Sequence, residues 1–79
     1  MTTAETIQKL KNTRVDVGML QIWYKAGRRF VILVAVANQC LIESYTTQQE
    51  AYAKQSAVTQ PSVVFALNAD LSLNLLEAA

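Results

Sequence analysis

The chain has 79 residues, of which 52% are apolar and 16% are charged, and its formal net charge is +1. This length suits one small domain with a modest core. The apolar content excludes intrinsic disorder, which requires few apolar residues and many charges. Two glycines and one proline exclude collagen-like and low-complexity chains, and a single cysteine excludes a disulfide within the chain.

The residues that carry chemistry form no catalytic or ligand-binding motif. Histidine is absent, so no Ser-His-Asp or Cys-His arrangement can form and no imidazole can ligate a metal. No two acidic residues lie within five positions of each other, which leaves no local calcium or magnesium loop. Gly18 and Gly27 stand alone, so no glycine-rich phosphate-binding loop is present. We expect a protein that is not an enzyme, with no cofactor and no metal, although acids distant along the chain could still meet in space.

No targeting segment is evident. Residues 1–11 lack the apolar region of a secretory signal peptide. The longest apolar stretch, Phe30–Ile42, is interrupted by Asn38 and Gln39 and is shorter than the roughly 20 residues that a membrane-spanning helix needs. We expect a protein of the cytoplasm or of a larger particle, neither secreted nor bound to a membrane.

The first predicted element is a short helix over residues 3–12. Thr2 and Glu5 form a capping-box pattern at its start. Ile7 and Leu10 follow at helical spacing and would form one narrow apolar stripe.

From Arg14 to Tyr24 the apolar residues alternate with a period of two, which predicts a strand. Gly18 lies where the apolar positions change from odd-numbered to even-numbered residues. A β-bulge at Gly18 and a tolerated glycine within a regular strand are equally good interpretations. Lys25–Arg28 is a predicted hairpin turn, in which Gly27 supplies a positive φ.

The central run, Phe30–Ala37, is β-branched and apolar on both faces, which predicts a strand covered on both sides. Asn38 and Gln39 would turn the chain into a further strand, Cys40–Tyr45. The alternative is a long central helix from about residue 29 to 58. The β-branched residues of the run disfavour it, because each loses rotamer freedom in a helix.

A second helix is predicted to begin at Thr47 and to run to about Val58. Thr47 and Glu50 form a second capping box, and Glu50 and Lys54 are a favourable pair four residues apart. Pro61 ends the helix.

Two apolar runs follow, Ser62–Leu67 and Leu71–Leu76, separated by a turn-forming triplet at residues 68–70. Both are predicted strands, and a leucine-rich helix from Asp70 is the alternative for the second. The predicted order is α-β-β-β-α-β-β, a single α+β domain over residues 1–79 with a small antiparallel sheet. The alternative fold is mostly α, built around the long central helix.

The apolar strands exceed the surface that two short, alanine-rich helices can cover, and edge strands of this composition pair readily with other chains. We therefore predict a non-enzymatic protein-interaction or oligomer-forming module: an assembly component, an accessory subunit or a small protein inhibitor. Its expected partner is a second copy, a larger protein assembly, or both. The predicted interface residues lie on the apolar strands: Phe30, Ile32, Val34, Val36, Val64, Leu71, Leu73 and Leu75.

The charge is unevenly distributed along the chain. Residues 1–29 carry six basic and two acidic groups, a net charge of +4, whereas residues 30–79 carry a net charge of −3. Basic groups near aromatic side chains can contact a phosphate backbone and stack on bases, so weak nucleic-acid binding is the alternative function. The residues predicted for that contact are Trp23, Lys25, Arg28 and Arg29.

Three further residues are predicted to have structural roles. Cys40 has no basic neighbour in the sequence that would lower its pKa, so we expect a small hydrophobe in the core or at a strand end. Tyr45 and Tyr52 are expected to seal the contact between helix and sheet.

Overall fold

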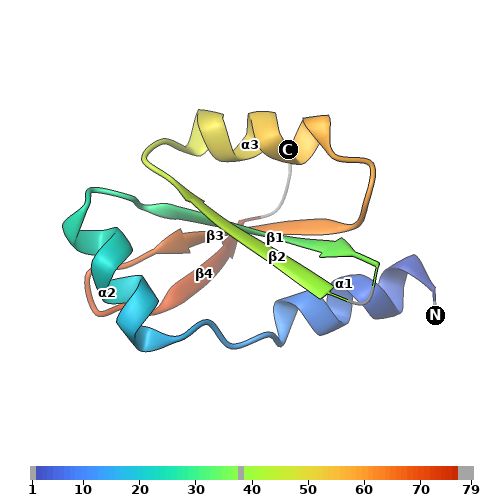
Figure 1. Ribbon diagram of the computed structural model, residues 1–79, viewed down its shortest axis with the longest axis horizontal. Helices are drawn as coiled ribbons and strands as arrows, with labels where there is room; N and C mark the ends of the chain where they lie inside the picture. The colour runs from blue at the N-terminus through green and yellow to red at the C-terminus, as the bar shows by residue number, and fades with distance from the viewer. Residues whose placement is uncertain (1, 38, 77–79) are drawn as a thin grey trace.

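The computed structural model of the chain describes residues 2–37 and 39–76. Figure 1 shows three layers, with α3 on one face of a central sheet and α1 and α2 on the other. The prediction of an α+β domain with a small antiparallel sheet is confirmed, and the mostly helical alternative is not supported. The elements in chain order are α1 (Thr3–Lys11), α2 (Val17–Lys25), β1 (Phe30–Val36), β2 (Gln39–Tyr45), α3 (Gln48–Ala57), β3 (Ser62–Leu67) and β4 (Leu73–Leu76).

The sheet has four antiparallel strands in the order β2-β1-β3-β4. β1 and β2 form a hairpin in which Val34 lies opposite Leu41. β1 also pairs with β3, with Ile32 opposite Val64, and β3 pairs with β4. β2 and β4 are therefore the two edges of the sheet, and β1 is a central strand.

β1 is buried on both faces, as its composition predicts. Leu33 packs with Leu10 of α1 in one core cluster, and Ile32 and Val34 pack with Ala51 of α3 in the other. The three β1 side chains are at most 1% exposed. The two clusters hold α1 and α3 onto opposite faces of the sheet.

The strand predicted from Arg14 to Tyr24 is wrong, because residues 17–25 form helix α2. Asp16 caps this helix, and its carboxylate accepts a hydrogen bond of 3.2 Å from the backbone N–H of Met19. Gly18 lies in the first helical turn and forms no bulge. The cap outweighs the strand-like alternation, which is too short to distinguish a period of 2 from one of 3.6.

The turn at Lys25–Arg28 ends α2 and does not connect two strands. Gly27 adopts the predicted positive φ, at +87°. The N–H of Arg28 donates to the carbonyl of Trp23, and the N–H of Gly27 donates to that of Tyr24. These two bonds form a Schellman motif, the usual way in which glycine ends a helix.

Both predicted N-caps are present. The backbone N–H of Glu5 donates to Thr2 Oγ1, and that of Glu50 donates to Thr47 Oγ1, each at 3.2 Å. These contacts explain why α1 and α3 begin at the predicted positions.

The last predicted strand is shorter than expected, and no terminal helix replaces it within the described residues. The N–H of Leu71 donates to the carbonyl of Asn68 at 2.9 Å, and Leu71 has a φ of +68°. Leu71 therefore belongs to the hairpin loop, and β4 begins at Leu73. The predicted turn residue Asn38 lies outside the described residues.

Candidate functional site

Half of the predicted interface residues lie in the core of the single chain. Ile32, Val34 and Val64 are at most 1% exposed beneath α3, and Phe30 is half-buried beside them. Ile32, Val34 and Val64 therefore have no surface to offer a partner while α3 is in place, and only part of Phe30 is accessible.

The remaining predicted interface residues lie at strand ends and in a loop. Leu71 and Leu73 are half-buried, whereas Val36 is 39% and Leu75 is 36% exposed. Sequence reasoning missed Leu41, which is 42% exposed on β2. Its exposure follows from the position of β2 at the edge of the sheet, which no local pattern reveals.

Val36 and Leu41 form an exposed apolar pair on the α3 face of the sheet. Leu41 lies directly opposite Val34, and directly opposed residues of an antiparallel pair point to the same face. Val36 points to that face too, because it is two residues beyond Val34 on the same strand. The two exposed side chains are therefore diagonal neighbours across the end of the hairpin.

The hydrogen bonds of β1 determine which backbone groups of β2 face outward. Ala35 N–H donates to the carbonyl of Pro61, and Leu67 N–H donates to the carbonyl of Arg29. The odd-numbered residues of β1 thus bond to β3, and the even-numbered ones bond to β2. Their partners on β2 are Gln39, Leu41, Glu43 and Tyr45. The residues that direct their N–H and C=O groups to the free edge are consequently Cys40, Ile42 and Ser44.

Arg28 covers one end of this edge. Its Nη1 donates to the Ser44 carbonyl at 3.0 Å and to Ser44 Oγ at 3.1 Å, and Ser44 is only 6% exposed. Within residues 2–37 and 39–76, no side chain bonds to the outward backbone groups of Cys40 or Ile42. The open part of the edge is therefore Gln39–Glu43.

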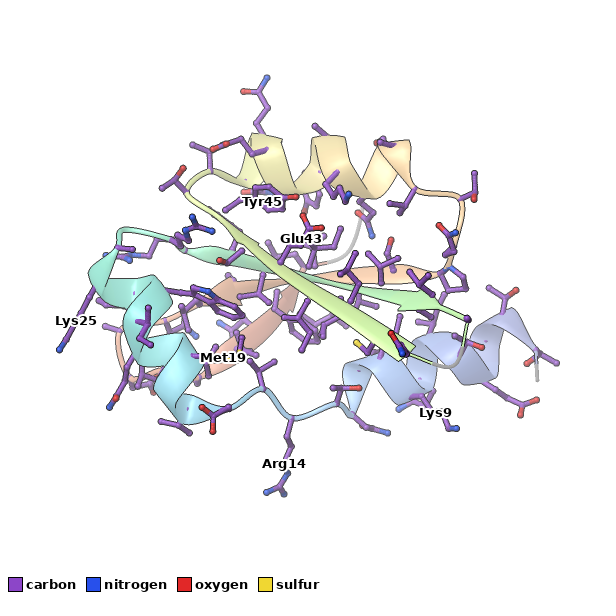
Figure 2. All side chains as sticks on the ribbon, viewed as in Figure 1. Lys9, Arg14, Met19, Lys25, Glu43 and Tyr45 are labelled. Atoms are coloured by element: carbon purple, nitrogen blue, oxygen red, sulfur yellow. The ribbon has the colours of Figure 1, made fainter. Side chains whose placement is uncertain are left out.

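The open edge carries one charged side chain, and that charge is paired. Lys54 Nζ lies 3.6 Å from Glu43 Oε1 on β2. The pair that the sequence predicts, Lys54 with Glu50, is not the one that forms. Tyr45 donates a hydrogen bond to the other carboxylate oxygen of Glu43. Figure 2 shows both residues between β2 and α3. Burial, together with this bond to Glu43, raises the pKa of Tyr45 to about 12, so the hydroxyl remains a donor at neutral pH.

Cys40 lies exposed at the start of the edge, at a strand end as predicted. Partial burial raises the pKa of its thiol, which makes it a poor nucleophile near neutral pH. Tyr45 and Tyr52 pack against the core cluster beneath α3, also as predicted. In the described part of the chain, no three acidic or cysteine residues come together in a way that could hold a metal ion.

The residues predicted to contact nucleic acid are largely used inside the fold. Arg29 stacks on the ring of Tyr24, 3.6 Å from its centroid, and donates to the Tyr24 carbonyl at 2.8 Å. Arg28 bonds to Ser44, and Trp23 is half-buried. Lys25 alone of the four extends freely into solvent (Figure 2).

A different group of cations is free on the face formed by α1 and α2. In Figure 2, Lys9, Arg14 and Lys25 extend away from the sheet on this side. Together with Lys11 they are exposed, and none has an acidic partner among the described residues. The acids Glu43 and Glu50 are engaged on the opposite side, by Lys54 and by two threonines respectively. The two helical layers therefore differ in charge.

None of the helices in the described part of the chain has the length and hydropathy needed to cross a bilayer. No family model, curated protein or solved structure matches the chain at a significant level.

Proposed function

We propose that this chain is a non-enzymatic protein-interaction module that binds its partner by strand addition at the open edge of β2. The observation that carries the proposal is the outward direction of the backbone groups of Cys40 and Ile42, beside the exposed side chain of Leu41. Natural sheets protect such edges with proline, lysine, bulges or a covering segment. Gln39–Glu43 contains no proline or lysine and has an uninterrupted register with β1.

Strand addition suits this edge energetically. An added strand would pair with the N–H and C=O groups of Cys40 and Ile42, and each such bond contributes a net of about 0.5–1.5 kcal/mol. The same strand would cover Leu41 and part of Val36, both about two-fifths exposed. In this mode of recognition the main chain supplies affinity, and alternate side chains supply specificity.

Amide hydrogen exchange tests whether the edge is open. In dilute protein, the amides of Cys40 and Ile42 should exchange fast, because they face solvent. The amides of Leu41 and Glu43 should exchange slowly, because they bond to β1. Slow exchange at Cys40 and Ile42 in dilute protein would show that the edge is covered and would refute the proposal.

Two proline variants test whether the edge binds. Cys40→Pro removes an outward N–H and an exposed side chain, so the fold should survive while association is lost. The matched variant Leu41→Pro removes an inward N–H from the β1–β2 ladder and should destabilise the protein by about 1–3 kcal/mol, because the β1 carbonyl that accepts this bond loses its donor. Circular dichroism and light scattering distinguish the two results. Unchanged association of a folded Cys40→Pro variant would contradict binding at this edge.

Weak nucleic-acid binding is the second candidate function, at the face of α1 and α2, which includes Lys25 but not Trp23, Arg28 or Arg29 of the residues predicted from the sequence. The unpaired cations Lys9, Lys11, Arg14 and Lys25 favour it. Retention of a single-stranded oligonucleotide should then fall steeply with salt. Changing Arg14 and Lys25 to Gln should reduce that salt slope by about 1.4, because each phosphate contact on a single strand contributes about 0.7. Retention that is independent of salt would remove this candidate.

A further inference from the structure

We propose that the strand added to β2 is β2 of a second copy of this chain, antiparallel, with Leu41 of the two copies meeting on a two-fold axis. This inference rests on the proposed function, since it names the partner of the same edge. The pairing would join two four-stranded sheets into one continuous sheet.

The open backbone groups select this register. In an antiparallel pair, opposed residues with outward groups exchange two N–H···O=C bonds. Each edge offers such groups at Cys40 and Ile42, because Arg28 already occupies the carbonyl of Ser44. Two copies satisfy all of these groups when Cys40 of one lies opposite Ile42 of the other. By symmetry this happens twice, and Leu41 falls on the axis between the two pairs.

The neighbouring registers leave open groups of Cys40 or Ile42 unpaired. A register centred on Ile42 would place Cys40 opposite Ser44, and the N–H of Cys40 would then need the carbonyl to which Arg28 already donates. A register centred on Cys40 would place Ile42 opposite position 38, which lies beyond the start of β2 at Gln39. Arg28 is therefore the residue that determines the register.

The side chains at this edge are complementary to themselves, which is what a two-fold interface requires. Leu41 would face Leu41 of the second copy at a position without backbone bonds, where Cβ atoms approach to about 5 Å. Val36 of each copy extends this apolar patch. Gln39 would face Glu43, so an amide meets a carboxylate and no like charges are opposed.

The interface is small, so the dimer should be weak and should form in a concentration-dependent manner. A strand from an unrelated protein would have to match the same short stretch, in which Glu43 is the one charged residue. The self-complementarity of Gln39, Leu41 and Glu43 favours a second copy, and binding of another protein is an outcome that the experiment distinguishes.

Cysteine cross-linking measures the register directly. In a Cys40→Ser background, Leu41→Cys places two thiols on the axis. Opposed Cα atoms at such a position are about 4.5 Å apart, a separation that a disulfide can bridge. Mild oxidation at a concentration where the dimer forms should therefore give a covalent dimer on a non-reducing gel. The natural Cys40 lies opposite Ile42, not opposite itself, so the wild-type chain should remain largely monomeric on the same gel.

Two further variants in the same background serve as matched controls. Gln39→Cys and Glu43→Cys should each cross-link poorly alone and efficiently when mixed, because these positions oppose each other only between copies. Efficient cross-linking of wild-type Cys40, or of Glu43→Cys mixed with Leu41→Cys, would overturn the register.

Sedimentation of the wild-type chain separates failure of this inference from failure of the proposed function. A monomer at all accessible concentrations, with fast amide exchange at Cys40 and Ile42, would overturn self-pairing and leave an open edge for another protein. A dimer that Cys40→Pro leaves intact would overturn both. A dimer that Cys40→Pro abolishes, together with the cross-link at Leu41→Cys, is the expected result.

Discussion

The guanidinium of Arg28 donates to the backbone carbonyl of Ser44 at 3.0 Å and thereby occupies an outward group of an edge strand. Arg28 follows the Schellman turn that ends α2, and Gly27 makes that turn possible through its φ of +87°. The end of a helix thus places a side chain over the edge of the sheet. The open edge is limited to Gln39–Glu43 as a result.

Removal of this contact should lengthen the open edge. In Arg28→Ala, the Ser44 carbonyl becomes available, and two copies can pair with Ile42 on the axis and Cys40 opposite Ser44. This register has two more backbone bonds, so the dissociation constant should fall by about tenfold. In this register Leu41 lies opposite Glu43 of the second copy. With Arg28→Ala and Cys40→Ser in every chain, Leu41→Cys alone should therefore cross-link poorly, and a mixture of Leu41→Cys and Glu43→Cys should cross-link efficiently.

Lys25→Ala is the control for this prediction. It removes one positive charge from an exposed neighbour whose side chain makes no ion pair with any other described residue. Its dissociation constant and cross-linking pattern should match those of the wild type. A register that stays centred on Leu41 in Arg28→Ala would show that Arg28 does not determine it.

Some elements can be predicted from a few consecutive residues, because a cap or a run of β-branched residues determines where they begin. Thr2 and Thr47 cap the starts of α1 and α3, as their spacing from Glu5 and Glu50 predicts, and β1 is predicted by its β-branched composition. The same kind of signal explains α2, which sequence reasoning assigned as a strand. Its cap, Asp16, precedes the helix without the glutamate that completes a capping box, so the start was less visible.

The cap at Asp16 should govern the local stability of α2. Asp16→Ala removes the acceptor for Met19 N–H and should cost about 1 kcal/mol. Leu20 is the one buried residue of α2, so the loss should appear as local opening, with amide exchange about fivefold faster in this helix. Asp16→Asn keeps a capping oxygen and should exchange almost as slowly as the wild type. Equal exchange in all three proteins would show that the cap is dispensable.

The candidate site could not be predicted from sequence in the same way. An apolar pattern identifies Ile32 and Val34 as strand residues but does not say which strand lies at an edge. That depends on the order β2-β1-β3-β4, which is set by contacts distant along the chain. The residues predicted as an interface on hydrophobicity alone therefore include buried ones, whereas Leu41 was missed.

The β1–β2 hairpin contains a strained residue that a substitution should relieve. Ala37 has a φ of +55°, a conformation that costs a residue with a Cβ about 1–2 kcal/mol. Asparagine tolerates this region better, so Ala37→Asn should raise the free energy of unfolding by about 0.5–1 kcal/mol. Urea denaturation measures the change. Ala69→Asn, in the loop of the other hairpin and without a positive φ, should have little effect, and a similar gain there would argue against strain at Ala37.

The contacts of Glu50 predict how acid weakens the start of α3. Thr46 Oγ1 and Thr47 Oγ1 each donate to Glu50 Oε1 at 2.9 Å, and these bonds, that of Thr46 first, lower the pKa of Glu50 from its ordinary value. The unfolded chain then binds a proton more readily than the folded one. The stability contributed by these bonds is therefore complete above the unfolded pKa and is lost as the pH falls through the folded pKa.

Two threonine variants separate this charge effect from the helix cap. Thr46→Ala should raise the pKa of Glu50 toward its ordinary value, as followed by a carboxyl NMR titration, with little loss of stability at pH 7. Thr47→Ala should raise that pKa too, and it should also cost about 1 kcal/mol at pH 7, because the backbone N–H of Glu50 loses its acceptor. Equal losses at pH 7 for both variants would show that the cap adds nothing to the carboxylate bonds. An unchanged pKa in Thr46→Ala would show that its hydroxyl does not hold the carboxylate in solution.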